Sequence, residues 1–283
     1  MTTVRTVLTI AALTLREAAR RRVLSALAVL TVVLLALSGW GFSRLAASEL
    51  GVTSGQARLA ASMLLNLVMF GLSLIAALGT ALLAGPTLSG ETESGIALAV
   101  FARPVRRSAV LLGKWLGLVA FGTGFVVVAG LALCLIVRVT ADYWPPEPAA
   151  GLALLAAQTA VLLTLGLLLS TAVSPMASGV VAVGLFGATW VAGVIGGVGE
   201  SLNNEGVSRV GTVSRMLLPT DGLWRGAMHA FQDPSSLAEF GPARNGFPFL
   251  SVAPLTATYL AWAAVWVAMV WGLAAASFSR RDL

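Results

Sequence analysis

Six long apolar stretches, almost free of charge, constrain this chain more than any other feature of its sequence. Hydrocarbon offers no hydrogen-bonding partner to a backbone, so each stretch must be a helix that satisfies its own N–H and C=O groups. About 20 residues at 1.5 Å rise cross a hydrocarbon core of about 30 Å. We therefore expect an all-α, polytopic membrane protein with six transmembrane helices. The spans are placed at about 23–43, 62–85, 114–137, 150–173, 177–199 and 252–277.

The composition supports a membrane protein and argues against a nucleic-acid-binding one. Of 283 residues, 58% are hydrophobic and 11% are charged, whereas soluble domains carry about 25% charged residues. The isoelectric point near 10.9 is high enough for a nucleic-acid-binding protein. However, the basic residues gather at the ends of the apolar stretches, where they act as orientation signals. We therefore expect no nucleic-acid partner.

The distribution of basic residues predicts the orientation of the chain. An even number of spans places both termini on the same side of the membrane. That side holds eleven basic residues, namely Arg5, Arg16, Arg20, Arg21, Arg22, Arg103, Arg106, Arg107, Lys114, Arg280 and Arg281. The other side holds seven, four of them in one long loop, which counts for little under the positive-inside rule. We expect both termini to be cytoplasmic.

Residues 1–22 are predicted to form a cytoplasmic amphipathic interface helix ahead of a single six-helix transmembrane domain, 23–283. A stripe of apolar residues repeats at helical spacing, with the members Val4, Leu8, Ala11, Leu15 and Ala18. Arg16 and Arg20 lie off the stripe, and Arg21 follows Glu17 by four residues, which suits a helical ion pair. This helix either lies among lipid headgroups or only anchors the topology.

The first apolar stretch also has to be compared with a cleaved signal peptide. A signal peptide has an apolar region of about 7–15 residues that ends at a small-residue cleavage site. Here the apolar stretch continues through Trp40 and Phe42, and five more spans follow. We therefore expect an uncleaved first helix.

The segment between the second and third spans is the most polar part of the chain. It contains Glu91 and Glu93, and then Arg103-Pro104. Proline removes a backbone donor and disfavours helical geometry in the residue before it, so a short helix over about 87–102 should stop there. Ser108 is then placed to cap the third helix. The pattern predicts a compact helix–turn–helix on the cytoplasmic face; the alternative is a solvated loop that follows the charge rule.

The segment of about 200–250 is predicted to lie outside, and it is long for a membrane-domain connection. Thr220 or Asp221 is placed to cap a helix after Pro219. Three large side chains then fall on one face of that helix, namely Trp224, Met228 and Phe231. The pattern is typical of a helix lying at the outer interface.

The fifth span is rich in glycine, and Gly193-x-x-x-Gly197 permits another helix to approach its backbone closely. We expect these glycines to serve helix packing or the contact between two copies of the chain.

The sequence lacks the residues of the usual catalytic, metal and nucleotide sites. Lys114 is the only lysine, and its surroundings lack the P-loop pattern. His229 is the only histidine, and Cys134 is the only cysteine and is expected to be a buried apolar residue. The span interiors hold no Asp, Glu, His or Arg of the kind that ion-coupled carriers use. Asn66 and Gln158 are expected to be interhelical hydrogen bonders. Energy for active transport must therefore come through the cytoplasmic surface.

In combination, these motifs resemble the permease subunits of ABC type-2 exporters. Within that group they are most similar to the branch named for multicopper-enzyme maturation, typified by the nitrous-oxide-reductase assembly transporter. The resemblance extends over the whole chain. It rests on Gly90-Glu-x-Glu-x-Gly95, Arg103-Pro-x-x-Arg107, Leu112-Gly-Lys114, Leu218-Pro-Thr-Asp221 with Arg225, the N-terminal Ala11–Leu24 and the closing Phe278-Ser-Arg-Arg281.

The resemblance implies two copies of this chain in a bacterial plasma (inner) membrane, above a cytoplasmic dimer of separate ATPase subunits that hold ATP and Mg. This chain would then be a non-catalytic subunit with no cofactor of its own. The motif places Glu91, Glu93 and Gly95 in a coupling helix that inserts into the ATPase. It places Pro104, Arg107 and Lys114 in the turn back to the membrane. Ile96 stands where the family usually has a hydroxyl residue.

Three functions are compatible with these patterns. The leading hypothesis is a transport subunit that exports a substrate and is driven, through the cytoplasmic segment, by ATP hydrolysis on a partner subunit. The second is a membrane scaffold or mechanotransmitter that acts on a periplasmic accessory protein, such as a metalloenzyme assembly factor, without moving a substrate. The third is a secondary carrier, which the charge-free span interiors disfavour.

Overall fold

The computed structural model describes residues 3–20, 23–47, 54–93, 107–233, 247–251 and 253–280, and within these ranges the regular structure is entirely helical. Six of the helices are long and apolar enough to cross a bilayer. They are α2 (Val23–Ala47), α3 (Ser54–Glu93), α5 (Arg107–Ala141), α6 (Pro148–Ser170), α7 (Pro175–Ser201) and α11 (Ala257–Ser279). Each predicted span falls on one of them, so the expected all-α, six-span architecture is confirmed.

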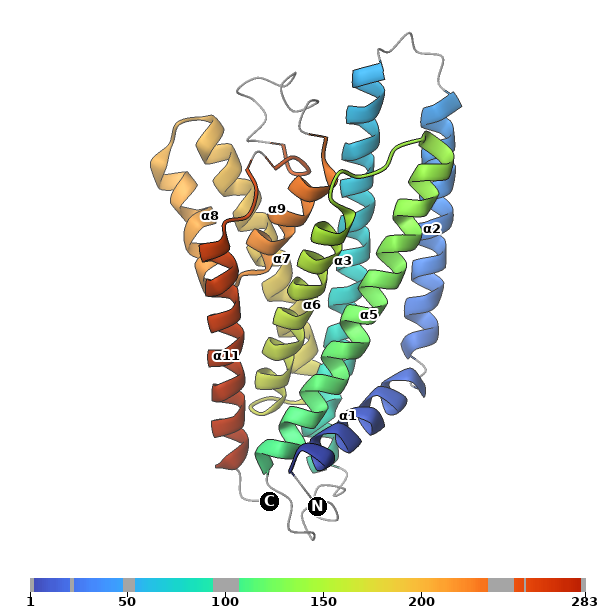
Figure 1. Cartoon of the computed structure of the whole chain (residues 1–283). Helices are drawn as coiled ribbons and strands as arrows, with labels where there is room; N and C mark the ends of the chain where they lie inside the picture. The colour runs from blue at the N-terminus through green and yellow to red at the C-terminus, as the bar shows by residue number, and fades with distance from the viewer. Residues whose placement is uncertain are drawn as a thin grey trace.

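The long helices run side by side, and both chain termini lie at the same end of the bundle (Figure 1). We call this end the termini end. Two shorter helices, α8 (Glu205–Leu217) and α9 (Thr220–Phe231), lie toward the opposite end, which we call the hairpin end. An even number of spans accounts for the shared location of the termini, whereas their cytoplasmic location stays a prediction.

Helix α6 forms the centre of the bundle. It contacts α3, α5, α7, α9 and α11, and every residue from 161 to 167 is buried. The peripheral helices α2 and α11 instead leave large apolar side chains exposed, among them Val32 and Val265. Outward-facing apolar residues are favourable in hydrocarbon, so α2 and α11 present lipid-facing surfaces.

A short amphipathic helix, α1 (Thr3–Arg20), lies obliquely across α5 at the termini end (Figure 1). Two glycines of α5 permit this contact. A Cβ atom added at Gly113 would lie 2.7 Å from Cβ of Ile10, and one added at Gly117 would lie 2.6 Å from the carbonyl oxygen of Ala11. Small residues let helix backbones approach closely. The Gly113-x-x-x-Gly117 spacing is therefore the sequence signal for a contact that sequence reasoning missed.

The apolar stripe predicted on α1 is divided between two environments. Ala18 is buried against the bundle, together with Val7 and Thr14. Val4 and Leu8 are 68% and 61% exposed. The helix itself is confirmed, and its exposed apolar residues are available to lipid, although lipid contact stays a prediction.

The second span does not end at Gly85-Pro86, as the sequence suggested. Helix α3 continues through Pro86 to Glu93, so residues 87–93 extend the span and do not begin a separate short helix. Proline restricts the preceding residue partly by a clash with its Cβ atom, and Gly85 has none. Residues 94–106, which include Gly95 and Pro104, lie outside the described residues. Helix α5 begins at Arg107, earlier than the predicted cap at Ser108 and span start at 114.

Candidate functional site

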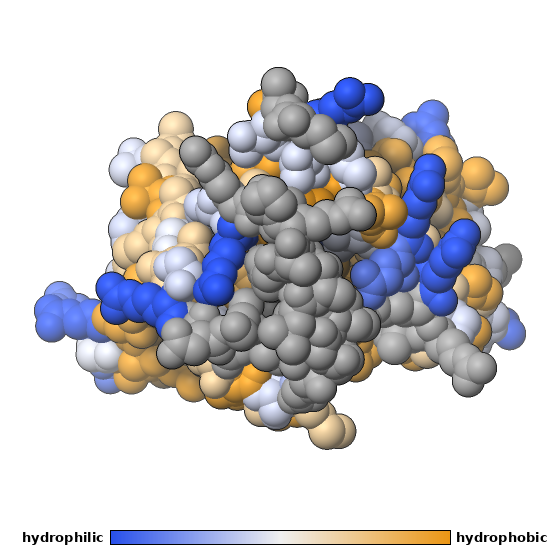
Figure 2. Space-filling model, turned by 90° about the horizontal axis from the view of Figure 1, so that it is seen from below, coloured by the Kyte–Doolittle hydropathy of each residue, from blue (hydrophilic) through white to orange (hydrophobic). Residues whose placement is uncertain are grey.

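The predicted ATPase-coupling residues that the structure describes lie at the termini end, where α3 ends and α5 begins. Glu91 and Glu93 belong to the last turns of α3, in a stretch whose side chains the structure does not describe. Arg16 and Arg20 are exposed on α1, and Arg21 lies outside the described residues. Viewed onto this end, strongly hydrophilic residues appear at several separate places on the surface (Figure 2). These hydrophilic residues suit a surface that contacts water or a soluble protein.

Lys114 lies inside the bundle and not in an exposed turn. Its side chain is buried, and Nζ donates a hydrogen bond to the Thr87 carbonyl oxygen at 2.9 Å. The same small space is bordered by Thr14, Glu17 and Ala18 of α1. Lys114 therefore joins α5 to α3 beside α1. A buried lysine of this kind positions the helix ends and does not itself present a contact surface.

Arg107 makes a second link at the termini end. Its Nη1 donates to the carbonyl oxygen of Ser279, the last residue of α11, at 3.3 Å. The C-terminus of a helix carries partial negative charge, so a guanidinium group is stabilising there. Arg107 thus ties the start of α5 to the end of α11, next to the predicted coupling segment.

At the other end, α8 and α9 form a hairpin that folds back against α7 and into the bundle. The turn after α7 contains Asn203 with a positive φ of 53°, a conformation that asparagine tolerates well. Asn204 then caps α8, because its side-chain oxygen accepts a hydrogen bond from the Val207 N–H. We call α8 and α9 together the re-entrant hairpin.

Glycines on one side of α7 hold the re-entrant hairpin close. A Cβ atom added at Gly196 would lie 2.7 Å from Cα of Gly211 in α8, and Gly193 faces the carboxylate of Asp221 in α9. Gly197 is buried as well. The close approach seen at Gly193 is therefore packing within one chain, while a contact between copies through Gly193 or Gly197 stays a prediction.

Substituting one glycine on each side of α7 tests this packing. Gly196→Ala should lower the free energy of unfolding by about 1–3 kcal/mol, because its methyl group meets backbone that cannot yield easily. Gly184 faces open space on the same helix, so Gly184→Ala should leave stability unchanged or slightly raised. Unfolding in detergent micelles measures both. Equal destabilisation by the two variants would contradict the packing role of Gly196.

Helix α9 is buried in the bundle, and the predicted location at the outer interface is wrong. Ten of its twelve residues are buried, including Trp224, Met228 and Phe231. The face that the sequence pattern assigned to the interface packs into the protein core. The Tyr143 hydroxyl donates to the Phe231 carbonyl oxygen at 2.7 Å, and burial raises the pKa of Tyr143 above its usual value, so the hydroxyl stays a donor.

Thr220 and Asp221 also differ from their predicted role, since neither caps α9. Pro219 precedes the helix, and Thr220 and Asp221 are its first two residues. The Thr220 hydroxyl instead lies 2.9 Å from the Thr189 hydroxyl of α7. The Asp221 side chain is only 2% exposed and makes ion pairs. Its position in the first turn is favourable, because helix N-termini stabilise negative charge.

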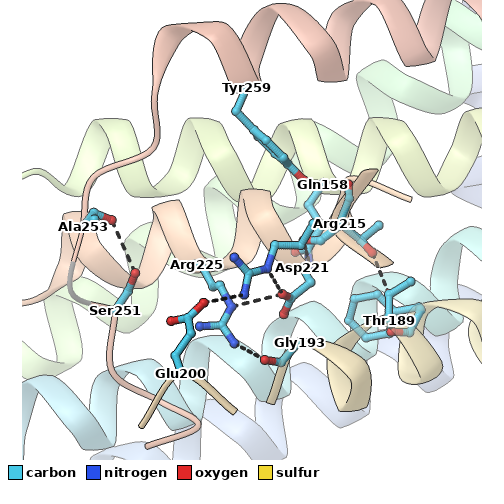
Figure 3. Close-up of polar contacts among 12 residues, drawn as sticks. Gln158, Thr189, Gly193, Glu200, Arg215, Asp221, Arg225, Ser251, Ala253 and Tyr259 are labelled. Atoms are coloured by element: carbon cyan, nitrogen blue, oxygen red, sulfur yellow. Dashed lines mark hydrogen bonds and ion pairs between the residues drawn. The ribbon is translucent and has the colours of Figure 1, made fainter. Parts of the chain in front are cut away.

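Asp221 is the centre of a buried ionic cluster at the base of the re-entrant hairpin (Figure 3). Its Oδ2 lies 3.0 Å from Nε of Arg225 and 3.2 Å from Nε of Arg215. Arg225 also donates to the carbonyl oxygen of Gly193. A further carboxylate, that of Glu200, lies 4.0 Å from Nη2 of Arg215. The cluster therefore joins α7, α8 and α9 through paired charges.

The ionic cluster lies within the depth of the spans. Glu200 lies at the end of α7, and Gly193 comes seven residues before it. The Gly193 carbonyl oxygen that accepts from Arg225 is therefore about 10 Å from Glu200 along the helix axis. The Asp221 side chain is 2% exposed, and the guanidinium groups of Arg225 and Arg215 compensate its charge. The span sequences are free of such charges, so sequence reasoning missed the cluster. The i, i+4 spacing of Asp221 and Arg225 was the available signal.

A chain of hydrogen bonds connects the re-entrant hairpin to α3. Gln158 of α6 donates through Nε2 to the Thr220 carbonyl oxygen at 3.2 Å, and its Oε1 accepts from the Ser73 hydroxyl at 3.2 Å. Asn66 of α3 donates through Nδ2 to the Phe249 carbonyl oxygen at 3.0 Å. Gln158 is thus confirmed as an interhelical hydrogen bonder, and Asn66 bonds to a connecting segment.

A cavity of about 280 Å³ with both polar and apolar walls lies beside the ionic cluster. Its polar lining residues include Glu200, Arg215, Arg225, Ser251, Thr256 and Tyr259. The Tyr259 hydroxyl of α11 donates to the Arg215 carbonyl oxygen at 3.0 Å. Among the described residues, no group of three His, Cys, Asp or Glu side chains is arranged to hold a metal ion. The site is built of ion pairs and hydrogen bonds between helices.

Comparison with known protein families gives one match that covers nearly the whole chain. The family model described as ABC-2 family transporter protein matches residues 8–283. A search of curated proteins finds no match.

Proposed function

Because this chain belongs to the ABC-2 family of transporter proteins, we propose that it is the permease subunit of an exporter driven by ATP hydrolysis on a separate subunit. The family and the six apolar helices make it a multi-pass membrane permease. Export, the ATPase partner and the pairing of two copies are the proposed parts.

The course of α3 is the observation that carries the proposal. This helix has 40 residues and is about 60 Å long, twice the thickness of the hydrocarbon core. It ends at Glu93, inside the segment whose motif resembles a coupling helix. Near its middle, Ser73 is linked through Gln158 to Thr220 at the re-entrant hairpin. A displacement at the termini end would therefore reach the hairpin end through one continuous helix.

The links at the termini end support coupled movement of several helices. Lys114 joins α5 to α3, and Arg107 joins α5 to α11. A partner that pushes on the segment between α3 and α5 would therefore move these helices together. We propose that ATP binding and hydrolysis on two partner subunits rock two copies of this bundle as rigid bodies, alternating access between the two sides.

The finer resemblance to the multicopper-enzyme maturation branch rests on sequence motifs alone. If the chain has that role, its hairpin end would face a periplasmic accessory protein. A gene for a periplasmic copper protein beside the gene for this chain would support the assignment. Neighbouring genes for an unrelated export system would contradict it.

The presence or absence of ATPase activity tests the proposed division of labour. The purified chain should hydrolyse no ATP, since it lacks a P-loop. The same chain, reconstituted in vesicles with its ATPase partner, should support ATP turnover that depends on both. Turnover by the chain alone, retained after contaminating ATPases are removed, would contradict the proposal.

Cysteine labelling tests the predicted orientation. The only native cysteine, Cys134, is buried, so single cysteines at Ser94, Ser279 and Ser235 can be labelled against a low background. A membrane-impermeant thiol reagent should reach Ser94→Cys and Ser279→Cys only from the cytoplasm, and Ser235→Cys only from outside, by the positive-inside rule. Labelling of Ser235→Cys from the cytoplasm would contradict the predicted topology.

A further inference from the structure

A wide apolar groove lies beside the re-entrant hairpin, separate from the ionic cluster. It has a volume of about 650 Å³ and is formed by α6, α7, α8 and α11. Leu185 and Ala188 of α7, Val210 and Val213 of α8, and Trp266 of α11 contribute to its lining. Arg209 is the only charged residue among its lining residues. We call this the hairpin groove.

The two faces of α8 have opposite surroundings. Its inner face packs on α7 at Gly211 and carries Arg215 into the ionic cluster. Its outer face carries Val210, Val213 and Leu217, which are 46%, 57% and 71% exposed. Because α8 packs along a membrane-spanning helix, these exposed apolar side chains are more stable in contact with hydrocarbon than with water. The groove is therefore open to a bilayer that supplies apolar chains.

The length and charge of the hairpin groove match one phospholipid. From Arg209 to Leu217 its lining residues on α8 cover about 12 Å of helix, which is most of the roughly 15 Å thickness of one leaflet's hydrocarbon. Arg209 lies near the start of α8, where the chain enters from the hairpin end. The apolar wall thus extends from the level of Arg209 into the leaflet.

Arg209 is free to exchange its present partner for a phosphate. Its Nη2 lies 3.2 Å from Oε2 of Glu205, but the two side chains are 77% and 86% exposed. An exposed pair of this kind contributes only about 0–1 kcal/mol, whereas a guanidinium group binds a phosphate through two parallel hydrogen bonds. We propose that the hairpin groove is a phospholipid-binding site, with one acyl chain in the groove and the lipid phosphate on Arg209.

Lipid retention in matched variants tests the proposal. The full chain is reconstituted into nanodiscs of phosphatidylethanolamine and phosphatidylglycerol, extracted in mild detergent, and weighed by native mass spectrometry. We expect one phospholipid retained per chain. Val213→Trp should fill the groove and lower retention about tenfold. Val128→Trp, at a residue 70% exposed on α5 and outside the groove lining, should retain lipid as the parent chain does.

The phosphate contact has its own control at the same end of the bundle. Arg209→Ala should lower retention by about fivefold to tenfold, the effect of losing a charge-assisted contact. Arg138 of α5 forms a similar exposed i, i+4 pair with Asp142, at 3.9 Å, and Arg138→Ala should have no effect. In nanodiscs of a phosphate-free galactosyl diacylglycerol, the parent chain and Arg209→Ala should retain equally little lipid.

Two outcomes would overturn the proposal. Retention by Val213→Trp equal to that of the parent chain would show that the groove holds no lipid. Efficient disulfide formation between two copies carrying Val213→Cys would show that a second copy covers the groove instead. Thermal unfolding of every variant checks that lost retention is not lost folding, and the exposure of Val213 and Arg209 favours intact folds.

Discussion

Replacing Asp221 with alanine should lower the free energy of unfolding by about 3–5 kcal/mol. The reason is the burial of its two partners. Arg215 and Arg225 have side chains only 22% and 19% exposed. Without the Asp221 carboxylate, Arg225 would lose its charged partner in the cluster, and Arg215 would keep only the Glu200 carboxylate at 4.0 Å. Breaking one partner out of a buried charge cluster is strongly destabilising. Unfolding in detergent micelles, followed by tryptophan fluorescence, measures the loss.

A second carboxylate in the same hairpin provides the matched control. Glu205 pairs with Arg209 at the same i, i+4 spacing, but that pair is almost fully exposed. Glu205→Ala should therefore change stability by only about 0–1 kcal/mol. If Asp221→Ala cost no more than Glu205→Ala, the cluster would not hold the re-entrant hairpin in place.

A compensated variant separates charge burial from lost packing. In Asp221→Ala combined with Arg215→Met and Arg225→Met, no uncompensated cation remains at the base of the hairpin. Apolar replacement of buried paired charges is often neutral or stabilising, and the remaining carboxylate, that of Glu200, is 41% exposed, so the triple variant should recover much of the lost stability. A triple variant as unstable as Asp221→Ala would point to lost shape complementarity at Gly193.

Replacing both Glu91 and Glu93 with alanine should abolish coupling to the ATPase while leaving the fold intact. We expect these carboxylates to pair with basic residues in a groove of the partner, where loss of partly buried pairs typically costs about 2–5 kcal/mol of association. The double variant should insert into the membrane normally. It should fail to co-purify with the ATPase, or bind it without transport-coupled ATP turnover.

The control for this variant makes the same charge change at the other end of the molecule. Glu147 and Glu205 are both exposed toward the hairpin end, away from the proposed ATPase contact. Their double replacement with alanine should leave ATPase binding and turnover unchanged. Full complex formation and full coupled turnover in the Glu91 and Glu93 variant would show that the segment is only a loop that follows the charge rule.

The sequence predicted the helices well and their ends less well. Apolar length and the absence of charge identify a span locally, and all six predicted spans fall on long helices. The continuation of α3 through Pro86 was not predicted, because proline is normally a helix terminator and the tolerance here depends on Gly85 before it. Residue type alone does not indicate which of two such opposing effects prevails.

The candidate site was predicted in part. Thr220, Asp221 and Arg225 were selected as a motif, but their expected roles in capping and at an interface differ from their buried ionic and hydrogen-bonded contacts. Lys114 was selected as well, yet it is buried against Thr87. The Asp221–Arg225 pair is local, but the other partners, namely Thr189, Arg215 and Thr87, come from other helices, so no local pattern contains them.

By itself the sequence determined that this protein is a helical, six-span membrane protein. The reason is that a backbone in hydrocarbon must satisfy its hydrogen bonds within each segment, which makes the requirement readable residue by residue. Only the tertiary structure decided that α9 enters the bundle, since its apolar face suits a lipid interface and a protein core equally well. Burial of α9 in the core is possible for two reasons. Glycines of α7 let the hairpin approach closely, and Arg215, Arg225 and Asp221 neutralise one another, whereas none of these charges could be buried alone.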